Sequence, residues 1–119
     1  MITLNLPFPP SVNHYWRYTN GKVLVSHRGR QYREAVKLAC LKIKSPMEGP
    51  LKVHLRAFPP DQRRRDLDNL NKAILDAMQA GGVYHDDSQI ADLRIVRAHT
   101  EKPGWIQAEI TPLEIAYAK

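Results

Sequence analysis

The sequence predicts one α+β domain, residues 1–119, with a mixed β-sheet and two main helices. A chain of 119 residues is long enough for one domain with a modest core and too short for two. Its composition, 43% apolar and 25% charged, is that of an ordinary globular protein. Alternating apolar residues typical of strands and apolar stripes typical of helices both occur, and no repeat or linker separates them.

The N-terminal quarter predicts a strand and a hairpin. Residues 2–6 alternate apolar and polar side chains, as a half-buried strand does, and the prolines that follow end it. Two β-prone runs, 15–18 and 22–25, flank Asn20-Gly21, a pair that readily adopts the positive φ angles of a tight turn. We therefore expect a hairpin arm with basic and aromatic side chains.

A helix is expected over about residues 27–44. Ser26 is a suitable N-cap, and the helix must end before Ser45-Pro46 because proline disfavours helical geometry in the residue before it. One face is apolar and predicts burial. A neighbouring stripe is basic and either binds DNA or is merely solvated; it consists of Arg30, Arg33, Lys37 and Lys44.

The C-terminal half predicts three more strands and a second helix. Residues 51–57 alternate like a strand and end at Pro59-Pro60. A helix follows over about residues 66–80, and Gly81-Gly82 are suited to its C-terminal cap. Beyond an acidic turn, the last two strand-like runs cover residues 93–98 and 105–110.

The charges are unevenly distributed along the chain. The 18 Lys and Arg residues outweigh 12 Asp and Glu residues, and the net charge of +6 indicates a polyanionic partner such as nucleic acid. Seven of the acids but only four basic residues lie in the segment 61–92, which gives that segment −3 and the rest of the chain +9. An acidic centre repels phosphate, so it suits metal-dependent chemistry on DNA better than simple coating of DNA.

Nothing in the sequence points to a membrane or to an oxidising compartment. The start lacks the pattern of a secretory signal, and no apolar run approaches the roughly 20 residues that span a bilayer. A single cysteine, Cys40, cannot form an internal disulfide, and the histidines lack zinc-site spacing. We expect a cytoplasmic protein with no membrane partner.

Asp66-Leu67-Asp68 is the most informative tripeptide. Carboxylates two residues apart can converge at a helix start, and Asp87 could join them because Gly81-Gly82 lets the chain turn back. Three hard oxygen donors suit Mg²⁺ or Mn²⁺. Lys72, one turn beyond Asp68, could then reach a phosphate, and guanidinium groups upstream could hold the DNA backbone; these belong to Arg63, Arg64 and Arg65.

Each of these residues also has a purely structural interpretation. Asp66 is a good N-cap, Asp68 suits the positive end of a helix dipole, and Asp86-Asp87-Ser88 is common turn chemistry. Asp68 and Lys72 could form a surface ion pair one turn apart. From the residues alone, a non-catalytic basic DNA-binding protein and a metal-dependent nuclease on branched DNA or RNA both remain open.

The central motif nevertheless resembles that of a known family. The segment RRRDLDNLNKA at 63–73, followed by Asp76-Ala77 and by DDSQI at 86–90, closely resembles the signature of the RusA family of Holliday-junction resolvases. The PPSVN segment at 9–13 and the pattern Ser26, Gly29, Tyr32-Arg33 are similar as well.

This resemblance implies a homodimeric, magnesium-dependent endonuclease that resolves four-way DNA junctions by paired symmetric nicks, in recombination and repair, without a small-molecule cofactor. It implies that Asp66, Asp68 and Asp87 bind the metal and that Lys72 is catalytic. It gives Asn69 and Asp86 supporting roles and Arg65 a DNA contact. The enzyme would act on bacterial or phage DNA at the nucleoid.

Overall fold

A four-stranded mixed sheet forms the centre of the protein in the computed structural model, which describes residues 1–113. Its strands follow the order β1-β6-β4-β5. Strand β6 pairs antiparallel with β1 and β4, whereas β4 and β5 are parallel. The strands are β1 (Ile2–Pro7), β4 (Leu51–Phe58), β5 (Ile90–Arg97) and β6 (Trp105–Pro112). The predicted α+β class with a mixed sheet is confirmed.

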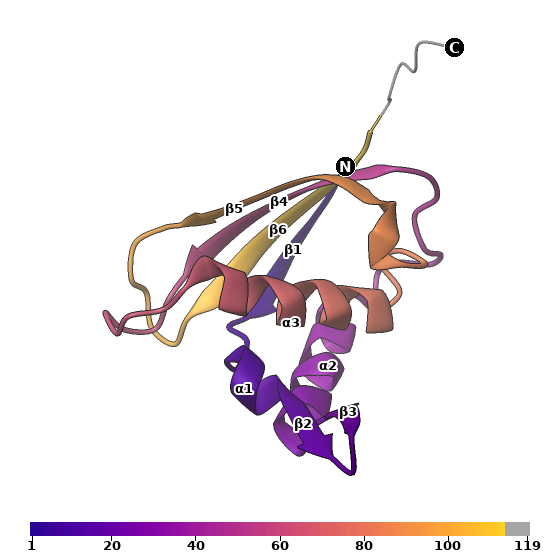
Figure 1. The fold of residues 1–119 in the computed structure, drawn as a ribbon. Coiled ribbons are helices and arrows are strands. Elements are labelled where there is room, and N and C mark those ends of the chain that lie inside the picture. Colours follow the sequence, from indigo (N-terminus) through magenta and orange to yellow (C-terminus); the bar gives the residue numbers. More distant parts are fainter. Residues whose placement is uncertain (114–119) are drawn as a thin grey trace.

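Two helices, α2 (His27–Ala39) and α3 (Leu67–Ala80), lie on one side of this sheet (Figure 1). The side chains of β4 alternate as the sequence predicts, and those facing the helices are almost completely buried. The predicted apolar stripe of α3 lies against them, with Leu70, Ile74, Ala77 and Met78 at 5% exposure or less. Among residues 1–113, no helix is long and apolar enough to span a bilayer.

Helix α2 is shorter than predicted. It ends at Ala39, and the Cys40 backbone N–H bonds back into the last turn of the helix. A further turn is closed by the Ile43 N–H on the Cys40 carbonyl, after which Met47 bonds to Val83. The chain leaves the helix early because Met47 must reach the segment beyond α3.

A short helix α1 (Val12–Tyr15) and a hairpin of β2 (Trp16–Thr19) and β3 (Lys22–Val25) precede α2. The hairpin turns at Asn20 and Gly21, both at positive φ, as predicted. Helix α1 was not predicted; it is held by the Ser11 carbonyl, which accepts from the His14 and Tyr15 N–H groups.

Gly29 explains how α2 packs against this segment. A Cβ atom at this position would lie 2.4 Å from the Tyr15 carbonyl oxygen and 2.7 Å from Cγ1 of Val25. Both are closer than atoms can approach, so α1 and β3 would have to move. The glycine recognised in the sequence pattern therefore serves the packing of α2.

Gly29→Ala should lower the free energy of unfolding by about 1–3 kcal/mol, because overpacking against a backbone carbonyl outweighs the gain in helix propensity. Urea unfolding measures this. The control Gln31→Ala changes an exposed position two residues along the same helix and should leave stability nearly unchanged. A Gly29→Ala protein as stable as the parent would contradict the close approach.

The topology of β4, α3 and β5 places the candidate site residues. Because β4 and β5 are parallel, the helix α3 that connects them runs in the opposite direction, from the carboxyl end of β4 to the amino end of β5. The start of α3 therefore lies at one end of the sheet and its C-terminus at the other. Arg97, at the end of β5, accordingly returns to the start of α3, where it donates to the Arg65 carbonyl oxygen.

Candidate active site

Two exposed carboxylates occupy the start of α3. Asp66 stands at the N-cap position with extended backbone angles, but its side chain caps no backbone N–H. Asp68 follows in the first turn. Both lie at the N-terminal end of α3, where the helix dipole is positive. Since Asp66 does not serve as a cap, its carboxylate is available to a ligand.

Lys72 lies one turn beyond Asp68 and is exposed. In the described part of the chain, Asp68 and Lys72 form no ion pair with each other. The pair of residues four apart that does form an ion pair is Asp61 and Arg65. The Lys72 Nζ atom instead lies 5.7 Å from the centre of the Trp16 ring. A cation over an aromatic face is held weakly, so this ammonium group can still reach a phosphate.

The turn that carries Asp87 is tightly organised. Asp86 caps the 3₁₀ turn η1 (Asp87–Gln89) by accepting from the Ser88 N–H, which lowers the pKa of Asp86. Partial desolvation and the neighbouring charge of Asp86 raise the pKa of Asp87. The Gln89 side chain accepts from the backbone N–H groups of His85 and Asp86.

Gln89 also donates to the Met47 and Gly49 carbonyl oxygens, both at 2.9 Å. One amide side chain thus makes four hydrogen bonds that join the Asp86-Asp87 turn to residues 47–49. The Asp87 N–H in addition donates to the side chain of Gln79, in the last turn of α3. Neither glutamine has a sequence pattern that predicts a role in positioning Asp87.

The expectation that Asp87 turns back beside Asp66 and Asp68 is wrong within one chain. Asp87 lies at the C-terminal end of α3, and the acids that raise its pKa are Asp86 and Asp76. From Asp68 to Gln79 the helix rises about 16 Å, whereas carboxylates that share one cation lie within about 5 Å of each other. Residues 1–113 contain no group of three or more potential ligands close enough to hold a metal ion.

The arginine-rich loop before α3 is organised by Asp61, a residue with no predicted role. Asp61 accepts from the backbone and guanidinium of Arg63 and, at 2.8 Å, from Nη1 of Arg65. These contacts hold the pKa of Asp61 well below its usual range, the hydrogen bond from Arg65 being the largest cause. The Arg65 guanidinium also lies 5.3 Å from the centre of the Phe8 ring.

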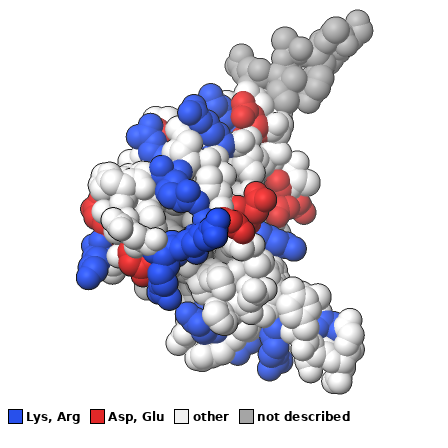
Figure 2. All heavy atoms as spheres, turned by 60° about the vertical axis from the view of Figure 1, so that its left-hand side comes forward, with Lys and Arg blue, Asp and Glu red and all other residues white. Residues whose placement is uncertain are grey.

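This loop borders a cleft of about 470 Å³ beside the start of α3. Figure 2 shows Lys and Arg side chains gathered on this face of the molecule, with acidic side chains among them. Asn69 lines an adjoining groove together with Asp66 and Arg64. The residues that line the cleft include Asp61, Arg63, Arg64, Arg65, Asp66 and Arg97. Basic and acidic side chains therefore border the same cleft.

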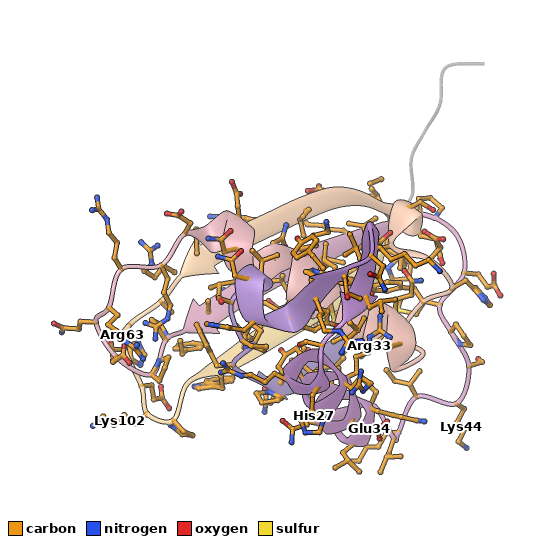
Figure 3. All side chains as sticks on the ribbon, turned by 60° about the horizontal axis from the view of Figure 1, so that its bottom comes forward. His27, Arg33, Glu34, Lys44, Arg63 and Lys102 are labelled. Carbon is orange, nitrogen blue, oxygen red and sulfur yellow. The ribbon has the colours of Figure 1, made fainter. Side chains whose placement is uncertain are left out.

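The basic stripe of α2 divides into two groups. The Arg33 guanidinium is engaged within the molecule and makes two hydrogen bonds of 2.8 and 2.9 Å to Asp76. The Tyr15 hydroxyl donates to the same carboxylate. In Figure 3 Arg33 lies among the helices, whereas Arg63 lies on the outer loop. Lys37 is exposed, and exposed Arg30 donates to the Val25 carbonyl oxygen.

The comparisons with known proteins agree on one family. The family model described as "Endodeoxyribonuclease RusA" matches residues 7–111. The chain belongs to the RusA family. The match includes every candidate site residue, from Arg30 to Asp87.

Curated relatives extend the RusA match over almost the whole chain. The crossover junction endodeoxyribonuclease RusA of Escherichia coli (strain K12) is 41% identical over 115 residues, which cover 93% of this chain and 94% of the relative. The crossover junction endodeoxyribonuclease rusA of Enterobacteria phage 82 is 40% identical, over 92% of this chain and 93% of the relative. The RusA resemblance noted in the sequence is thus confirmed, and both bacterial and phage proteins share it.

Proposed function

We propose that this chain is a Holliday-junction resolvase, an endonuclease that cuts four-way DNA junctions by metal-dependent hydrolysis of phosphodiesters. The observation that carries the proposal is the RusA family match over residues 7–111, with relatives named crossover junction endodeoxyribonucleases. The exposed acids at the start of α3, beside an arginine-lined cleft, support it. We propose accordingly that it acts in the cytoplasm, on DNA of the bacterial nucleoid or of a phage.

The acids fit a hard divalent cation, Mg²⁺ or Mn²⁺. Asp66, Asp68 and Asp87 all offer exposed carboxylate oxygens. Partial desolvation and the charge of Asp86 raise the pKa of Asp87, and a bound cation would relieve this repulsion. When bound, the cation supplies an activated water and offsets charge on the scissile phosphate. Lys72 stabilises the same developing charge, and the arginines of the loop orient the DNA backbone.

The separation of the acids along α3 supports a homodimer. Helix α3 is about 21 Å long, so one subunit holds Asp66 and Asp68 at one end and Asp87 at the other. A two-fold axis perpendicular to α3 near its middle reverses the direction of the helix in the partner. The start of α3 in one subunit then lies beside the partner's Asp87, and two equivalent three-acid sites form.

The edge of the sheet beside α3 is suited to this interface. Strand β5 is an eight-residue edge strand, and native proteins usually cover such edges. Leu93 of β5 pairs in register with buried Val53, yet it is 40% exposed. A partner against α3 and β5 would cover Leu93. Two equivalent sites related by a two-fold axis also match the approximate two-fold symmetry of a four-way junction and its paired symmetric nicks.

Gln89→Met should raise the Mg²⁺ concentration needed for half-maximal nicking by about 10- to 100-fold, the usual cost of losing a group that orients a metal ligand. Methionine keeps the length of the side chain but makes none of the four hydrogen bonds. Junction binding without metal should be unchanged. Gln31→Met, at an exposed position on α2, is the control. An unchanged Mg²⁺ midpoint would show that Gln89 does not position Asp87.

The proposed function is tested by incubating the protein with end-labelled substrates, in Mg²⁺ or in EDTA. We expect symmetric nicks in a four-way junction, with little cutting of linear duplex, flapped DNA or RNA, and no cutting in EDTA. Binding without any nicking would instead indicate a non-catalytic DNA-binding protein. Preferential cutting of flaps or RNA would indicate a nuclease with a different substrate.

A further inference from the structure

The hairpin of β2 and β3 projects from the helical side of the molecule (Figure 1). Each strand has four residues, and Tyr18 pairs directly with Val23 in the antiparallel register. Tyr18 is 69% exposed and Val23 58% exposed. A two-stranded ribbon of this length is marginal by itself in water, and this mostly exposed apolar pair gains little from burial. The arm therefore has the form of a surface that binds a partner.

The charge of this region indicates that the partner is anionic. The first 33 residues of the chain contain no Asp or Glu, and the first acid is Glu34. The hairpin itself carries Arg17 and Lys22. The lower part of Figure 2, where the hairpin lies, accordingly shows Lys and Arg side chains but no acidic ones. A nucleic acid fits this surface better than a second protein chain with its mixed charges.

The base of the arm connects it to the candidate active site. Trp16 and Tyr18 are two residues apart on β2, so their side chains lie on the same face of the ribbon. The Trp16 ring faces the Lys72 ammonium group at 5.7 Å. A DNA strand whose phosphate meets Lys72 would therefore have its neighbouring nucleotides beside the Trp16–Tyr18 face.

We propose that the β2–β3 arm binds DNA bases at the crossover of the junction, by stacking of an exposed base on the Tyr18 ring beside Val23. This proposal rests on the proposed function and adds the part of the substrate that the arm recognises. In continuous duplex, every base face is covered by its neighbours. Where strands exchange, base pairs can open and expose a face, and aromatic side chains bind such faces with little sequence preference. The arm thus distinguishes a junction from linear DNA.

The test compares Tyr18→Ala with Tyr18→Phe, which keeps the aromatic ring, in the full-length protein. Affinity for a four-way junction and for linear duplex is measured in EDTA, with thermal unfolding and gel filtration of each variant as checks on fold and assembly. Tyr18→Ala should weaken junction binding by about 5- to 150-fold, the range for loss of one stacked base. Duplex binding should stay the same, and Tyr18→Phe should behave like the parent.

A second readout uses 2-aminopurine, a fluorescent base, placed at the crossover. The parent and Tyr18→Phe should change its fluorescence on binding, and Tyr18→Ala should change it much less. Equal loss of junction and duplex affinity, or no loss, overturns the proposal. Loss of the dimer in Tyr18→Ala also overturns it and assigns the arm to a second copy of the chain. A parent protein that neither prefers nor nicks junctions contradicts the proposed function instead.

Discussion

Asp68→Asn should reduce junction nicking at least about 100-fold while leaving junction binding in EDTA intact. The substitution keeps the size of the side chain and its place in the first turn of α3, but it removes a negatively charged oxygen donor. Loss of a group that only orients a metal ligand already costs about 10- to 100-fold, so loss of a ligand itself costs more. The measurement is the single-turnover rate of nicking at saturating Mg²⁺.

The matched control for this prediction is Glu34→Gln, which makes the same change of charge at an exposed position on α2. It should nick at the parent rate. Tight binding of the junction by Asp68→Asn separates catalysis from affinity, because removal of an acid near phosphate can only favour binding electrostatically. Nicking at the parent rate by Asp68→Asn would exclude this carboxylate from the metal site.

Much of the fold could be predicted because its signals are local. The alternation in residues 51–57 and the apolar stripe of residues 67–78 depend only on the sequence of each segment, and both lie where expected. The turn at Asn20-Gly21 is equally local. The early end of α2 depends on the contact of Met47 with Val83, residues far apart in the sequence, and local periodicity carries no signal for it.

The sequence predicts a set of candidate site residues but not how these residues are arranged in space. The motif identifies Asp66, Asp68 and Asp87, yet their separation follows from the parallel pairing of β4 and β5, which fixes the direction of α3. Arg33 likewise belongs to the basic stripe from which a DNA contact is predicted. Its actual partner, Asp76, lies 43 residues further along the chain. A partner at such a distance is set by tertiary packing.

The same topology explains why the proposed dimer would be needed for cutting. In one subunit the acids at the two ends of α3 lie too far apart to share a cation, so in the proposed dimer each cutting site is built from both subunits. Every homodimer of a single acid variant then has two damaged sites. A heterodimer is different when one subunit is changed at the start of α3 and the other at Asp87. Both substitutions then lie in the same composite site, and the other site keeps all three acids.

The shared site is tested most directly by a heterodimer of one Asp68→Asn subunit and one Asp87→Asn subunit. The heterodimer is purified after co-expression with two affinity tags, and its nicking of the junction is measured. Each homodimer should be inactive, and the heterodimer should regain one of its two sites, giving about half the parent nicking rate as single, unpaired nicks. The control heterodimer of Asp66→Asn and Asp68→Asn, whose changes lie at the same end of α3, should stay inactive. An inactive Asp68→Asn and Asp87→Asn heterodimer would contradict the shared site.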